Sequence, residues 1–110
     1  GSTRRPKNHL RRYPWCRFER QITVPSVRLD SLYFGDRMTD FIWADVQGAE
    51  GDLILRGLET FHYTRVVYTE YSNEELYEGQ ATLKQIQTML PDFDVVEVFS
   101  DDVLLKNRNL

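Results

Sequence analysis

The stretch FIWADVQGAEGDLILRGLE, residues 41–59, decides the fold class of this chain. Residues 41–46 are apolar on both alternating faces up to Asp45, as in a strand of a parallel sheet that helices cover on each side. From residue 50 to residue 62 apolar side chains repeat at helical spacing, at Leu53, Ile54, Leu58 and Phe61. The stretch therefore predicts a strand in the middle of a sheet, followed by a helix.

Beyond this stretch, short apolar runs alternate with helical patterns. We expect a second strand at residues 65–69 and a helix that Pro91 ends. Two further strands are expected at residues 93–99 and 103–106, and the short link between them forces an antiparallel pair. The order of elements predicts an α/β fold with a mostly parallel sheet that ends in an antiparallel hairpin.

Composition limits the chain to one small domain. Its 110 residues are 41% hydrophobic and 13% aromatic, which is enough for a core. No apolar run approaches the roughly 20 residues that a membrane span needs, so we expect no membrane association. The single cysteine, Cys16, allows no internal disulfide and fits a reducing compartment, which is the basis for expecting a cytoplasmic protein.

The first twenty residues form a basic arm ahead of the domain at residues 21–110. The arm carries seven arginines and lysines against the single acid Glu19. Such an arm either binds phosphate groups or is a solvated loop, and charge runs are more often the latter. Nucleic-acid binding ranks last among the functions considered, because acidic residues dominate the rest of the chain.

Acids that follow the predicted strands are the candidate catalytic residues. Asp45 and Glu70 each stand where a strand ends, and ligands of α/β sheets bind outside the carboxyl ends of the strands. We assign both acids to proton transfer or to orienting an acceptor. The alternative for Asp45 is a carboxylate that accepts hydrogen bonds from the amides of the next helix.

Three further residues are expected on the substrate side. Gln47 and Glu50 flank the same turn, and Tyr77 belongs to a segment that we expect over the acceptor pocket. Glu50 also fits a plain first-turn helix acid, and Gln47 a backbone hydrogen bond. Asp45, Glu50 and Glu70 could together hold a divalent cation through oxygen ligands, but no spacing of acids, histidines or cysteines marks a metal site, so none is expected.

Three segments of the sequence resemble the FkbM family of S-adenosylmethionine-dependent methyltransferases. They are DFIWADVQGAEGDLILRG, VVYTEYSNEELYEGQATLKQI and VPSVRLDSL. In that family a DxQGAE or DxEGAE segment follows the fourth strand of a Rossmann-like fold. The resemblance implies O-methylation, the transfer of a methyl group from S-adenosylmethionine to a hydroxyl, often on a sugar or a small natural product.

One departure from the family pattern concerns the cofactor. The family's glycine-rich turn, of the form Val-x-Asp-x-Gly-Ala-Asn-x-Gly, has no counterpart among the six glycines. We therefore expect the C-terminal half of the catalytic domain, inactive alone and binding S-adenosylmethionine weakly, with no assignable cofactor-binding residue. The alternative is a non-catalytic half-domain that pairs with another chain through an exposed sheet edge, as a binding or scaffold module.

Overall fold

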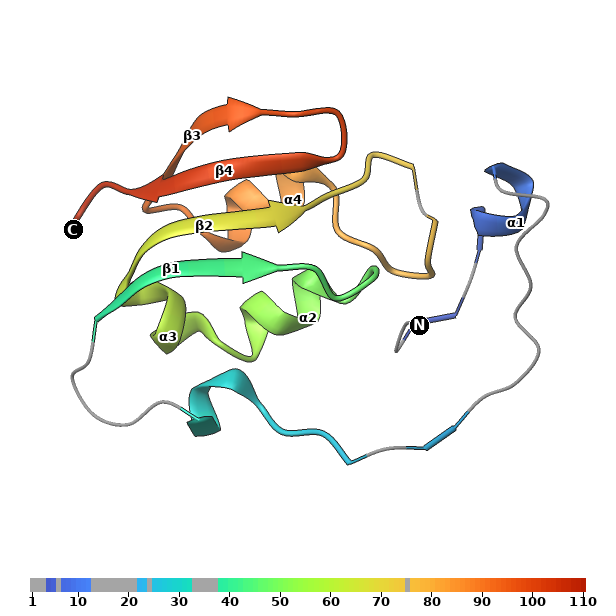
Figure 1. The fold of residues 1–110 in the computed structure, drawn as a ribbon, viewed down its shortest axis with the longest axis horizontal. Helices are drawn as coiled ribbons and strands as arrows, with labels where there is room; N and C mark the ends of the chain where they lie inside the picture. The colour runs from blue at the N-terminus through green and yellow to red at the C-terminus, as the bar shows by residue number, and fades with distance from the viewer. Residues whose placement is uncertain (1–3, 6, 13–21, 24, 33–37, 75) are drawn as a thin grey trace.

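The computed structural model describes residues 4–5, 7–12, 22–23, 25–32, 38–74 and 76–110 (Figure 1). The aromatic residues of the basic arm, Tyr13, Trp15 and Phe18, lie outside these ranges. The described elements, in chain order, are α1 (His9–Arg12), a 3₁₀ turn η1 (Leu29–Leu32), β1 (Thr39–Ala44), α2 (Glu50–Leu55), α3 (Leu58–His62), β2 (Thr64–Glu70), α4 (Leu83–Met89), β3 (Phe93–Val98) and β4 (Asp102–Asn107). The α/β fold class predicted from the sequence is confirmed.

The four strands form one sheet in the order β1-β2-β4-β3. Strands β1 and β2 are parallel, and β4 is antiparallel to both of its neighbours. The hairpin expected from the short link between the last two strands is therefore confirmed. Because the chain returns through this hairpin, its latest strand lies between β2 and β3.

The position predicted for β1 is wrong within the described sheet. This strand lies at the edge and pairs only with β2. Its sequence is apolar on both faces, which indicated burial on both faces, yet Phe41 is 52% exposed and Trp43 is 71% exposed. The strand has the composition of a covered central strand, but in the described residues nothing covers one of its faces.

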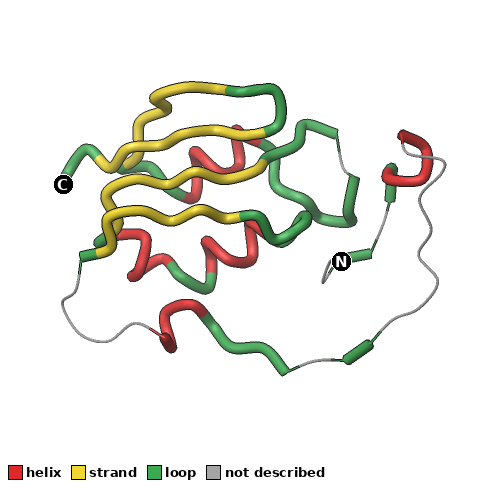
Figure 2. The backbone as a smooth tube through the Cα atoms, viewed as in Figure 1, coloured by secondary structure: helices red, strands yellow, loops and turns green. Residues whose placement is uncertain are grey.

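Helices cover the other face of the sheet (Figure 2). Their apolar side chains meet those of the strands in one core, formed by Ile54, Phe61, Val67, Ala81, Ile86, Leu90, Phe93, Val103 and Leu105. The single helix expected over residues 50–62 is two helices, α2 and α3, with Gly57 between them. A Cβ atom on Gly57 would lie 2.6 Å from Leu29 Cδ2, so the break lets η1 pack closely.

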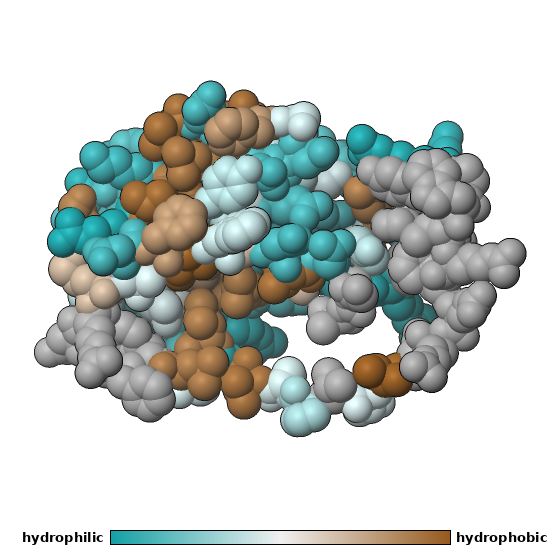
Figure 3. Space-filling model, in the orientation of Figure 1, coloured by the Kyte–Doolittle hydropathy of each residue, from teal (hydrophilic) through white to brown (hydrophobic). Residues whose placement is uncertain are grey.

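The face of the sheet opposite the helices carries a row of apolar and aromatic side chains. We call it the bare face. Cross-strand register places Phe41 beside Val66 and Trp43 beside Tyr68. The rings of Trp43 and Tyr68 make an edge-to-face contact with centroids 6.5 Å apart, and Phe99 lies 5.9 Å from Tyr68. Figure 3 shows a band of apolar residues on the side of the molecule that faces the viewer, with hydrophilic residues on both sides of it. Among the described residues, no helix has the length and apolar character that crossing a bilayer requires.

Candidate active site at the carboxyl ends of the parallel strands

Three acids meet at one edge of the sheet. Asp45 directly follows β1, Glu70 is the last residue of β2, and Glu50 opens α2. Each offers a carboxylate oxygen, and these oxygens lie within 4.8 Å of one another. The carboxyl ends of two parallel strands thus bring together the two acids that the sequence assigned to catalysis.

A left-handed turn separates Asp45 from Glu50. Gln47 and Gly48 have φ angles of 51° and 97°, a conformation that favours glycine. The turn directs the amides of Val46 and Gly48 toward Glu50, whose two carboxylate oxygens accept them at 3.1 Å each. Glu50 is 1% exposed, so it holds the turn together from inside.

These bonds separate the alternatives left open for the turn residues. Glu50, rather than Asp45, accepts the amides near the start of α2. Asp45 is exposed, and its Oδ1 accepts a 2.8 Å hydrogen bond from Gln47 Nε2. The Gln47 side chain therefore orients the Asp45 carboxylate at the rim of the sheet.

The pKa of Glu70 is raised from 4.5 to about 7. Burial is the main cause, followed by its hydrogen bond with Asp45 and by repulsion from nearby acids, including Glu50 and Asp102. Burial also raises the pKa of Glu50. At neutral pH Glu70 therefore holds its proton about half of the time, within hydrogen-bonding reach of Asp45.

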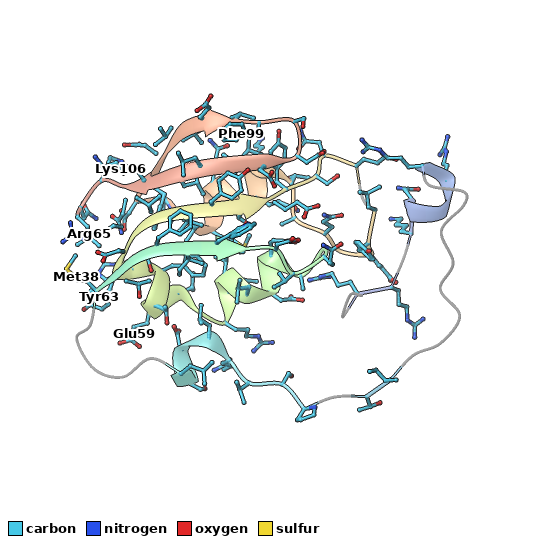
Figure 4. All side chains as sticks on the ribbon, in the orientation of Figure 1. Met38, Glu59, Tyr63, Arg65, Phe99 and Lys106 are labelled. Atoms are coloured by element: carbon cyan, nitrogen blue, oxygen red, sulfur yellow. The ribbon has the colours of Figure 1, made fainter. Side chains whose placement is uncertain are left out.

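Basic side chains of the sheet lie at its other end. Figure 4 shows Arg65 of β2 and Lys106 of β4 away from the edge where Glu70 lies. Arg65 pairs with Asp40 at 3.3 Å. The charged neighbours that shift the pKa of Glu70 are all acids, so their repulsion adds to the rise that burial causes.

The structure adds Asp102 and Tyr68 to the site, and the sequence did not indicate either. Asp102 begins β4 and is paired in register with Glu70. Its Oδ2 accepts a 2.8 Å hydrogen bond from the Tyr68 hydroxyl, which raises the pKa of that phenol. The sequence pattern placed Asp102 in the hairpin link, whereas in the structure it is the first residue of β4. The neighbour of that strand could not be read from the pattern.

Tyr77 lies behind the turn instead of over an open pocket. It is 7% exposed, and a Cβ atom on Gly48 would come within 2.7 Å of Tyr77 Cβ. A cavity of about 440 Å³ lies between α2 and α4 and is bounded by Arg4, Asp52 and Lys84 among others. Among its described lining residues there is none of the three acids, so this cavity is separate from the acid site.

The described turn does not fit the cofactor of a methyltransferase. A cofactor-binding turn presents free backbone amides to its ligand. Here the amides of Val46 and Gly48 already bond to Glu50, an acid of the chain itself. The turn after β1 therefore builds the acid site, and these two amides are not available to S-adenosylmethionine.

Comparison with known proteins identifies the family. Residues 3–101 match the family model described as Methyltransferase FkbM domain. The chain belongs to the FkbM methyltransferase family. It is also 50% identical, over 116 aligned residues, to the 2-O-methyltransferase NoeI of Sinorhizobium fredii (strain NBRC 101917 / NGR234). No solved structure matches the chain.

The match to that FkbM relative is unequal in coverage. It includes 100% of this chain but 48% of the relative, so the chain spans about half of the relative's length. Membership of the family confirms the resemblance seen in the sequence. The acids at the sheet edge are thus the candidate catalytic groups of an FkbM sequence.

Proposed function

We propose that this chain supplies the acceptor side of an FkbM O-methyltransferase. Asp45 and Glu70 together take the proton of the hydroxyl that becomes methylated. The observation that carries the proposal is the Glu70 carboxyl with a pKa of about 7, hydrogen-bonded to Asp45 at the ends of two parallel strands. A general base works best when its pKa lies near the working pH.

The acceptor in this proposal is a neutral hydroxyl compound, a sugar or a small natural product. The name of the Sinorhizobium relative, 2-O-methyltransferase, supports an oxygen acceptor. Carboxylates accept hydrogen bonds from hydroxyls, whereas an anionic acceptor would be repelled by the same acids. Gln47, Glu50 and Tyr77 act on the acceptor through the turn whose shape they fix.

S-adenosylmethionine belongs, in this proposal, to a glycine-rich half that the described residues do not build. That half docks on the bare face and extends the sheet beside β1. Two observations support this docking: β1 has the apolar composition of a covered strand, and Phe41 and Trp43 on it are exposed. The chain alone is then inactive, because it supplies the proton acceptor without the methyl donor.

A second candidate function rests on the same surface. A bare apolar face beside an unpaired strand edge also suits a non-catalytic half-domain that pairs with another chain. In that case the partner binds through β1 and the bare face, and no methyl group is transferred.

Reconstitution separates the two functions. The chain is produced together with the part of the Sinorhizobium relative that lies outside the match, and transfer of a labelled methyl group from S-adenosylmethionine to a panel of sugars is measured. We expect transfer by the pair and none by either part. Binding of the two parts without any transfer supports the half-domain instead.

Variants then test the acid pair. Asp45→Asn lowers kcat by about 100-fold, the usual size of a general-base contribution, and Glu70→Gln acts in the same direction. Asp40→Asn is the matched control, since Asp40 is an exposed acid at the opposite end of β1. Near-normal transfer by Asp45→Asn would show that Asp45 is a turn residue only.

The cofactor is tested on the isolated chain by calorimetry. Since the family's glycine-rich turn has no counterpart among the six glycines, we expect weak binding of S-adenosylmethionine or none, and no heat at micromolar concentrations. Micromolar affinity of the isolated chain would overturn the assignment of the cofactor to another half.

A further inference from the structure

The N-terminal segment lies along the loop that follows β2. The Lys7 amide donates to the Leu76 carbonyl at 3.0 Å, and the Glu78 amide donates to the Arg5 carbonyl at 2.6 Å. Figure 1 shows this segment beside the loop, on the side where β1 and β2 end. Two parts of the chain that are some seventy residues apart are thus bonded backbone to backbone.

Arg4 joins this loop to a helix through one side chain. Its Nη1 donates to the Glu78 carbonyl at 2.8 Å, and its Nη2 lies 2.7 Å from Asp52 Oδ2 in α2. The Arg4 side chain is 21% exposed, so the contact is partly shielded from water. Gly79, with a φ angle of 75°, leaves room for the guanidinium, because a Cβ atom there would overlap Arg4 Nη1.

The loop held by Arg4 carries Tyr77, and Tyr77 reaches the acid site. The ring of Tyr77 packs on Gly48 so closely that a Cβ atom on Gly48 would lie 2.9 Å from its ring carbons. Gly48 in turn donates its amide to Glu50. A continuous series of contacts therefore runs from Arg4 through Tyr77 to the turn between the acids.

We propose that Arg4 is a positioning residue for the acid site of this family member. It clamps the loop at residues 76–80 onto α2, so that Tyr77 holds the Gln47–Gly48 turn and the spacing of Asp45 and Glu50. The role in catalysis rests on the function proposed above. An exposed ion pair alone contributes little, but Arg4 bonds a helix and a loop at once, in a space that only glycine at position 79 provides.

The test uses NMR spectroscopy of the 110-residue chain with three variants. Arg4→Ala removes both bonds, Arg4→Lys keeps the charge but forms one bond at a time, and Arg12→Ala is the matched control. Arg12 belongs to the same segment and forms an exposed ion pair with Glu74 at 3.3 Å. The readouts are the exchange rate of the Glu78 amide and the chemical shift of Gly48, which reports the position of the Tyr77 ring.

We expect the Glu78 amide to exchange about tenfold faster in Arg4→Ala, because a charge-assisted clamp on the loop is lost. The Gly48 signal shifts in Arg4→Ala, shifts less in Arg4→Lys, and is unchanged in Arg12→Ala. An unchanged Gly48 signal in Arg4→Ala, or an equal shift in Arg12→Ala, would overturn the proposal. If Arg4→Ala does not fold, the graded response between Arg4→Lys and Arg12→Ala decides in the same way.

Neither NMR readout depends on methyl transfer, so the two proposals fail separately. In the reconstituted pair described above, we expect Arg4→Ala to lower kcat several-fold while KM for S-adenosylmethionine stays unchanged, because the acids move but the cofactor half does not. If the Gly48 shift appears and no variant of the pair transfers methyl groups, the proposed function fails and the clamp stands. If transfer occurs and Arg4→Ala matches Arg12→Ala in kcat, the clamp fails and the function stands.

Discussion

Replacing Glu70 by glutamine tests the electrostatics of the acid site through stability. The pKa of this carboxyl is 4.5 when unfolded and about 7 when folded, so the folded chain binds the proton more tightly. The resulting stabilisation is complete below pH 4.5, declines as the pH rises, and is lost above pH 7. The difference corresponds to about 3 kcal/mol, which solvent screening of a half-buried group reduces to about 1–2 kcal/mol.

Glutamine cannot ionise, so Glu70→Gln lacks this pH dependence. In urea unfolding at pH 8 we expect the variant to be more stable than the original chain by about 1–2 kcal/mol, a midpoint about 1 M higher. At pH 4.5 the two midpoints coincide. Glu97→Gln, at an exposed position on β3, serves as the control and changes neither value.

The result that refutes this reasoning is a variant less stable than the original chain at pH 8. It would mean that the Glu70 carboxylate is stabilised by its surroundings, as in an ordinary ion pair. If the variant is stabilised and also abolishes methyl transfer in the reconstituted pair, Glu70 serves the chemistry at the expense of stability, as is common for active-site residues.

Three other substitutions test the local structure, each by urea unfolding. Gly48→Ala adds a Cβ atom 2.7 Å from Tyr77 Cβ at a φ angle of 97° and lowers the free energy of unfolding by about 2 kcal/mol, whereas a neutral result would contradict the turn geometry. Asn107→Ala leaves two backbone carbonyls without the buried amide that donates to them at 3.2 and 3.0 Å, and it costs about 2 kcal/mol; a loss below half of that would contradict the bonding. Burial raises the pKa of Asp30, but hydrogen bonds, led by the one from the Thr60 amide, outweigh burial and lower the pKa below 3.8. The ionised carboxylate therefore stabilises the folded chain above pH 3.8, and this contribution is lost as the pH falls. Asp30→Asn therefore costs about 1 kcal/mol at pH 7 and less as the pH falls below 3.8, and an equal cost at both would show that charge is not the cause.

Local patterns were enough to predict the hairpin and the meeting of the acids. Three residues between two strands leave no room for a crossover, and a carboxylate after each of two parallel strands must come to the same edge. Asp45 and Glu70 were identified on this ground alone. Neither prediction depends on the order of the other strands in the sheet.

Long-range pairing was beyond the sequence pattern. Strand β4, rather than β3, pairs with β2, so Asp102 lies opposite Glu70 across a pairing that no short-range signal specifies. The role of Glu50 was also missed, because a first-turn acid and a buried anchor for two amides look the same in one sequence. For β1 the pattern correctly indicated apolar side chains on both faces of the strand. Whether other elements pack on both faces depends on parts of the fold that are distant in the sequence.

The place of β4 in the sheet has a consequence for synthesis on the ribosome. Strand β4 emerges after the other three, yet it supplies the pairing on both of its sides, to β2 and to β3. Until residues 102–107 leave the exit tunnel, the β1–β2 pair is the part of the described sheet that can form, and β3 lacks its partner there. Folding of this unit is therefore expected to be late and abrupt, with the apolar strands dependent on chaperones until then.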